Sequence, residues 1–307
     1  MSYSTSDILE IASQQRRHDN RPGILDAKYL RFVGLQASEV EYLLAHPKAE
    51  VLEFHSCYWD IRDGNPKSTH GAARVVRLIG TTIKDTGLNE VLCRFPKLRS
   101  LVYYRPSDEV DTCFDEMGRE LTKHGQHLEH LELVNEALMP FYTEFGSLHK
   151  LINLKSLEID LEFLIGFREN PREYDDYMDA GFDPEEEELD YEEINREAGD
   201  WSLVKMLPHS LEKLTIHIEY PKLEVYFNTY ERYGAKFEEL LTAEGQFDNL
   251  RWVNAPRLNT VAEKLCGRST EWALLGNSKC TMARTPRRTE AKADASDSSV
   301  ADTETIA

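Results

Sequence analysis

The chain has 307 residues, of which 41% are hydrophobic, and its formal net charge is -19 at pH 7. This length and composition allow one extensive folded core or two ordinary domains. The negative charge argues against nucleic acid and anionic membrane surfaces as partners, because both would repel the chain. It favours a basic protein partner.

The cysteines are odd in number and include no C-x-x-C pair, which is typical of a reducing compartment. They are Cys57, Cys93, Cys113, Cys266 and Cys280. Residues 1–22 form a polar N-terminal segment with a short apolar run at 8–12, and no stretch of the chain approaches the length of a membrane helix. We expect an intracellular protein of the cytoplasm or nucleus.

The pattern L-x-x-L-x-L recurs along the chain and is clearest at Leu128-Leu131-Leu133, Leu154-Leu157-Ile159 and Leu211-Leu214-Ile216. With degenerate copies included, eight copies begin at residues 27, 49, 73, 98, 128, 154, 211 and 250. Most early steps lie in or near the range of about 20 to 29 residues that is typical of leucine-rich repeats. We therefore predict an α/β fold: an irregular leucine-rich repeat solenoid with a curved parallel sheet and helices on its outer side.

Helical segments are predicted between the strands, because amphipathic runs there end at proline, glycine or polar loops. They cover residues 40–44, 88–95, 114–124, 139–151, 201–207 and 237–242. The repeat domain is expected to span residues 23–278, with a cap after residue 255 that covers the last repeat.

An acidic insertion explains the long step between the copies at 154 and 211. Residues 168–200 contain fifteen acidic and three basic residues, and removing these 33 residues leaves an ordinary step of 24. A solvated charge run is the favoured interpretation, while interleaved aromatic residues leave open that the segment docks on a basic partner. Residues 279–307 are expected to be a disordered tail, in which Thr285, followed by Pro286 and Arg288, is a candidate phosphosite.

The candidate binding surface consists of strand residues that alternate with the buried apolar ones, and we expect it to face the inner side of the curve. Mixed charge and exposed tyrosine on a concave strip are suited to gripping a protein segment. The predicted partner-binding residues are Arg31, Glu53, His55, Arg77, Tyr104, His130, Glu132, Glu158, Asp160, Lys213 and His217, with Val102, Ser156 and Thr215 on the same face.

Catalytic, cofactor and metal sites are not predicted. The sequence has no G-x-S-x-G, no phosphate-binding or dinucleotide-binding glycine motif and no H-E-x-x-H. His124, His127 and His130 have a suggestive spacing, but the register divides them between a helix end and a strand. An enzyme would need acids or histidines in a closed cleft near Glu132, Glu158 or Asp160.

The repeats resemble those of fungal F-box and leucine-rich repeat proteins, most clearly in the phrase Leu-Pro-x-Ser-Leu-x-x-Leu at residues 207–214. The resemblance covers roughly residues 27–255. It implies that the repeats hold a protein and that an N-terminal F-box contacts the adaptor of a cullin ubiquitin ligase. Here about 22 residues precede the first repeat, whereas an F-box needs about 40, so we expect the F-box to be missing. We expect a non-enzymatic interaction scaffold, with a ubiquitin-ligase substrate receptor as the alternative.

Overall fold

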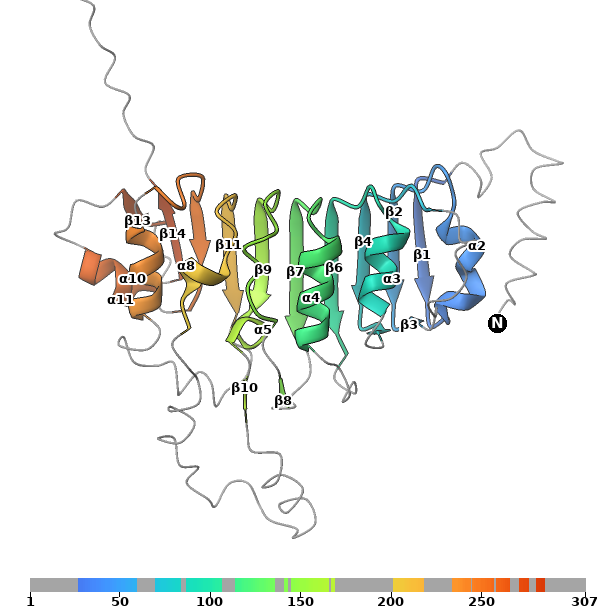
Figure 1. Ribbon diagram of the computed structural model, residues 1–307, viewed down its shortest axis with the longest axis horizontal. Helices are drawn as coiled ribbons and strands as arrows, with labels where there is room; N and C mark the ends of the chain where they lie inside the picture. The colour runs from blue at the N-terminus through green and yellow to red at the C-terminus, as the bar shows by residue number, and fades with distance from the viewer. Residues whose placement is uncertain are drawn as a thin grey trace, which may run out of the picture.

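A computed structural model describes residues 27–59, 70–83, 87–106, 114–135, 141–142, 145–165, 167–168, 201–217, 234–243, 245–256, 258–265, 271–275 and 280–284. The described residues form an α/β fold around one large, mostly parallel sheet with helices between its strands (Figure 1). The coarse prediction of an α/β protein with a parallel sheet is confirmed.

The main sheet has ten strands, and from β1 to β12 their order in space follows their order in the chain. All neighbours in that run are parallel. The strands are β1 (Tyr29–Val33), β2 (Val51–His55), β4 (Val75–Ile79), β6 (Ser100–Arg105), β7 (His130–Asn135), β9 (Ser156–Asp160), β11 (Lys213–His217) and β12 (Trp252–Asn254). All eight predicted strand positions are therefore confirmed.

The central apolar residue of each pattern occupies the same register position in its strand. This row is fully buried from β2 to β12 and consists of Leu52, Val76, Leu101, Leu131, Leu157, Leu214 and Val253. A single strand and helix cannot bury their apolar sides alone, whereas neighbouring copies share one core. The prediction that Leu131, Leu157 and Leu214 point inward and stack is confirmed.

Helices cover one face of this sheet, and most of them lie in front of it in Figure 1. Six of the helical segments fall at or near predicted positions except for shifts at their ends, while α5 and α11 were not predicted as helices. The segments are η2 (Ala37–Val40), α2 (Glu41–Leu44), α3 (Gly87–Arg94), α4 (Phe114–His124), α5 (Leu161–Ile165), α8 (Leu203–Met206), α10 (Ala235–Thr242) and α11 (Leu258–Leu265).

The predicted helix at 139–151 is wrong for the residues that the structure describes there. Phe141–Tyr142 form a short strand, β8, which pairs with β10 (Phe167–Arg168), and residues 145–151 contain no helix. The backbone N–H of Phe145 donates to Phe163 and that of Leu148 to Met206, both at 2.8 Å. Gly146 has a φ of +73°, which ends any helical path. The backbone therefore bonds to neighbouring segments instead of to its own turn.

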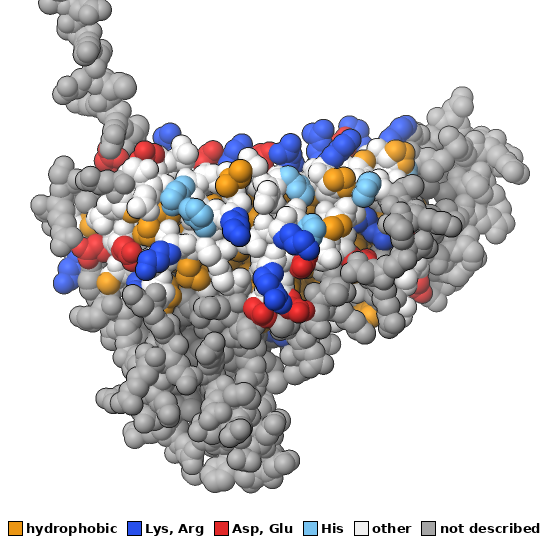
Figure 2. All heavy atoms as spheres, viewed as in Figure 1, with side chains coloured by type: hydrophobic (Ala, Val, Ile, Leu, Met, Phe, Trp, Pro, Cys, Tyr) orange, Lys and Arg blue, Asp and Glu red, His pale blue; other side chains and the backbone are white. Residues whose placement is uncertain are grey.

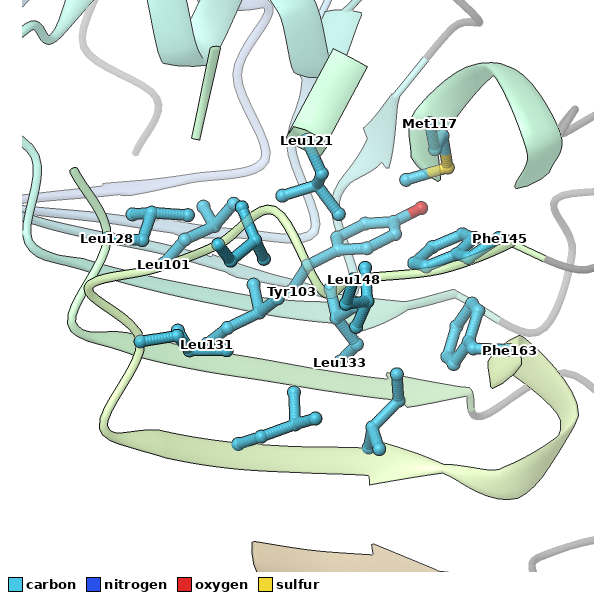
Figure 3. Close-up of a cluster of buried hydrophobic side chains, with 14 of the residues drawn as sticks. Leu101, Tyr103, Met117, Leu121, Leu128, Leu131, Leu133, Phe145, Leu148 and Phe163 are labelled. Carbon is cyan, nitrogen blue, oxygen red and sulfur yellow. The ribbon is translucent and has the colours of Figure 1, made fainter. Parts of the chain in front are cut away.

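The apolar side chains of this segment still reach the core. Figure 3 shows Phe145 and Leu148 beside Tyr103 of β6 and beneath Met117 and Leu121 of α4. Phe145 also packs against Phe163, with ring centroids 4.9 Å apart. The apolar spacing that predicted a helix is thus satisfied by an irregular segment.

The sheet ends in an antiparallel addition. β14 (Thr281–Arg284) pairs with β12 and with β13 (Trp272–Leu274), and Met282 is buried. These strands cover the last parallel strand, as a cap should. The tail was expected to begin at residue 279, so its predicted boundary is wrong, because Met282 belongs to the core. A further short pair, β3 (Tyr58–Trp59) and β5 (Thr82–Ile83), lies beyond the ends of β2 and β4.

Candidate functional site

The candidate surface, here called the strand face, is formed by the positions that alternate with the buried row from β1 to β12. Strand register places these positions in three lines across the sheet. The middle line is Arg31, Glu53, Arg77, Val102, Glu132, Glu158, Thr215 and Asn254. His130 and Lys213 belong to the line before it, and His55, Tyr104 and His217 belong to the line after it.

Most of the predicted binding residues keep solvent access on this face. Arg31 and Arg77 have about half of their side chains exposed, at 52% and 46%. The histidines and glutamates of the prediction are partly buried, and Lys213 is exposed. The structure therefore brings ten of the eleven predicted residues to one accessible surface.

Asp160 is the exception, and the prediction that it faces solvent is wrong. It has the right alternation, but it is the last residue of β9, the chain continues directly into α5, and its side chain is fully buried. Val102 and Thr215 have the alternation of the strand face but are also buried, at 6% and 3% exposure.

The first charged cluster is centred on Glu53 of β2. Its carboxylate lies 3.5 Å from Arg31, 3.2 Å from Arg77 and 2.5 Å from the Nε2 atom of His55. Burial alone would raise the pKa of Glu53, but hydrogen bonds from His55, Arg77 and Tyr29 together lower it below its ordinary value of 4.5. Glu53 is therefore a carboxylate at neutral pH, and it joins three adjacent strands.

The second cluster is centred on Glu132 of β7. The hydroxyl of Tyr104 donates to its carboxylate, and the Nε2 atom of His130 lies 3.6 Å away. The interaction with His130 lowers the pKa of Glu132 most, burial opposes it, and the hydrogen bond from Tyr104 lowers it further. Glu132 is thus held ionised in the middle of the sheet.

A second glutamate lies beside Glu132 on the next strand. Glu132 and Glu158 are register partners on β7 and β9, so their Cα atoms are about 4.8 Å apart. Glu158 lies 2.9 Å from the Nε2 atom of His217 on β11. Like charges on neighbouring positions of a sheet repel each other and do not help the sheet to form. The arrangement is instead suited to attracting a cationic side chain.

A row of charged residues along one edge of the sheet was missed by our sequence reasoning. The second residue of every copy of the pattern is charged: Lys28, Glu50, Arg74, Arg99, Glu129, Lys155, Glu212 and Arg251. We call this row the charged rim. Figure 2 shows both basic and acidic side chains along the edge at which the strands begin. This regularity was visible in the sequence once the pattern was aligned.

The charged rim has a clear structural role. Ion pairs link neighbouring copies at Lys28–Glu50 (3.1 Å), Arg99–Glu129 (2.9 Å) and Lys155–Glu129 (3.3 Å). The backbone carbonyls of the rim residues accept N–H groups of the following copy, as when Arg99 accepts from Glu129 and His130. The rim residues from Lys28 to Glu212 therefore satisfy backbone donors where the next strand begins, while the carbonyl of Arg251 accepts from Arg284 at the end of β14.

Several predictions lie outside the described residues. These are the N-terminal segment 1–22, the acidic insertion beyond Arg168 and the phosphosite Thr285. Within the described ranges, no three histidine, cysteine or acidic side chains are grouped so that they could hold a metal ion. In the same ranges, no helix combines the length and apolar character needed to cross a membrane.

Comparison with known proteins adds no assignment to this geometry. No protein-family model, curated protein or solved structure matches the chain.

Proposed function

We propose that the chain is a leucine-rich repeat solenoid that works as a non-enzymatic scaffold and binds a basic segment of another protein on its strand face. The pairing of Glu132 and Glu158 carries this proposal. Two carboxylates occupy adjacent register positions at the centre of an accessible sheet face, and donors from Tyr104, His130 and His217 orient them. A lysine or arginine placed between them would relieve their mutual repulsion.

The rest of the strand face supports a protein partner over a small molecule. Charged clusters recur from β1 to β11, and Lys213 lies 4.7 Å from the ring centre of Trp252 at the far end. An array spread over that many strands is suited to an extended segment. The overall charge of -19 also favours association with a basic partner.

The test is affinity purification from a cell lysate with quantitative mass spectrometry. The strand-face variant is Glu132→Lys with Glu158→Lys, and its matched control is Glu116→Lys with Glu263→Lys on helices α4 and α11. Both variants change the net charge by the same amount. Circular dichroism and thermal unfolding establish that both fold before the comparison is made.

We expect a basic protein that is retained by the parent chain and the helix-side control and is lost from the strand-face variant. Equal retention by both variants, or equal loss, would contradict a specific strand-face site. A chain without residues 168–200 tests whether the acidic insertion contributes to the same binding. Recovery of a cullin-ligase adaptor would favour the alternative role as a substrate receptor.

A further inference from the structure

A second group of interacting polar side chains lies on the helix-covered face, away from the strand face. Cys93 is in the last turn of α3, and His124 is the last residue of α4, the neighbouring helix (Figure 1). The Sγ atom of Cys93 lies 3.6 Å from the Nδ1 atom of His124 and 3.0 Å from the Oδ1 atom of Asn89. Cys93 is exposed. A cysteine, a histidine and an amide therefore meet at an accessible point.

A carboxylate lies on the other side of His124. Its Nε2 atom lies 3.3 Å from the Oε2 atom of Glu120, one turn earlier in α4, and both atoms are shielded from solvent. The C-terminal end of α4 and the Glu120 carboxylate both place negative charge beside this imidazole. His124 is thereby suited to take the proton of the Cys93 thiol.

Other charges near this contact are largely balanced. Arg94, next to Cys93, pairs with Glu41 of α2 at 3.0 Å, and Lys123 lies 3.9 Å from Glu120. The C-terminal end of α3 opposes a thiolate at Cys93, but its partial charge is about half an elementary charge spread over several carbonyls. A nitrogen base, the Nδ1 atom of His124, is in direct contact with the Sγ atom and can receive its proton.

We propose that Cys93 and His124 form a reactive pair that makes Cys93 a site of thiol–disulfide exchange with small disulfides. His124 accepts the thiol proton at Nδ1, and Sγ attacks one sulfur of the disulfide. The new S–S bond forms as the old one breaks, and the departing thiolate takes the proton from His124. Cys93 is oxidised to a mixed disulfide while one half of the reagent is reduced to a thiol, so no further oxidant is needed.

The consequence is a modification site that is independent of the proposed protein-binding face. A mixed disulfide at Cys93 would project from the helix layer, where Figure 2 shows charged and histidine side chains open to solvent. Glutathione-sized disulfides fit such an open site, because Cys93 lies on the surface and not in a closed pocket.

The experiment treats the full chain with neutral 2-hydroxyethyl disulfide and follows each cysteine by peptide mapping. Cys280, the other exposed cysteine of the described residues, is the internal reference. At pH 6.5 we expect Cys93 to react about threefold faster than Cys280, because the neighbouring His124 can take the thiol proton as the Sγ atom attacks. The ratio should fall toward pH 9, because removal of the proton by the solvent then competes with the help from His124.

His124→Gln is the decisive variant, and His149→Gln is its matched control on the same side of the sheet. We expect His124→Gln to slow Cys93 about threefold at pH 6.5 and to remove the pH dependence of the ratio. Cys280 should be unaffected in both variants, and thermal unfolding verifies that each is folded. An unchanged rate of Cys93 in folded His124→Gln, or a ratio that does not vary with pH in the parent chain, would overturn the proposal.

Discussion

The two faces of strands β1 to β12 differ in how many residue types they contain. On the core face the central row contains only leucine and valine from β2 to β12, and every member is fully buried. On the strand face, the adjoining middle line changes from arginine and glutamate through valine to paired glutamates and then threonine and asparagine. Close packing restricts the core face to apolar side chains that stack on their neighbours. The strand face has no such restriction, so its residues are open to selection for binding.

A charge placed on the core face should have the largest effect of any substitution considered. Leu157→Asp buries a carboxylate where β7, β9 and β11 meet, and we expect a loss of about 3 to 5 kcal/mol in unfolding free energy. The matched substitution Ser156→Asp, one residue earlier and facing the strand face, should cost less than about 1 kcal/mol. Chemical denaturation measures both, and equal effects would mean that the two faces are wrongly assigned.

The close contact between α4 and the irregular segment after β8 should give the next largest effect. A Cβ atom on Gly118 would lie 2.0 Å from the backbone oxygen of Phe145, which cannot move without displacing the core. We expect Gly118→Val to destabilise the chain by about 2 to 3 kcal/mol. Arg119→Ala, on the exposed side of the same helix, should change thermal unfolding little; a tolerated valine at 118 would argue against this contact.

Acid should weaken the clusters of the strand face before it affects the core. The pKa values of Glu53 and Glu132 are lowered in the folded chain, so their contribution to stability is complete above about pH 5. It is lost as the pH falls below 4.5 and through the folded pKa values, because the unfolded chain then binds more protons. Denaturant unfolding between pH 6 and pH 3 measures this loss.

Glu53→Gln with Glu132→Gln should make unfolding less dependent on pH in that window. The control is Glu263→Gln on α11, which is exposed and lies away from both clusters. A double variant with the same pH dependence as the parent chain would show that these two carboxylates do not carry the acid response.

The charged rim should give the smallest effect. Glu129→Ala removes ion pairs to Arg99 and Lys155, but all three side chains are substantially exposed. Pairs of this kind contribute about 0.2 to 1 kcal/mol, and salt screens them. We expect a loss in that range at low ionic strength that shrinks in 1 M salt. A loss that persists in 1 M salt would show that Glu129 acts through packing and not through charge.

The sequence by itself determined the positions of the parallel strands and of the helices α3 and α4. Each L-x-x-L-x-L copy places three apolar residues on the side that must be buried, and α4 begins and ends where its amphipathic run does. It also contained the charged rim, because position two of every copy is charged. These features are local, since they depend on residue type and spacing within one copy of the pattern.

Only the tertiary structure decided the rest. Residues 145–151 have helical spacing, yet Phe145 and Leu148 give their backbone bonds to Phe163 and Met206, segments that are distant in the chain. Asp160 alternates correctly but is buried at a strand-to-helix junction. Cys93 meets His124 across 31 residues because α3 and α4 lie side by side. In each case the deciding contact joins residues from different elements, and spacing within one element does not contain that information.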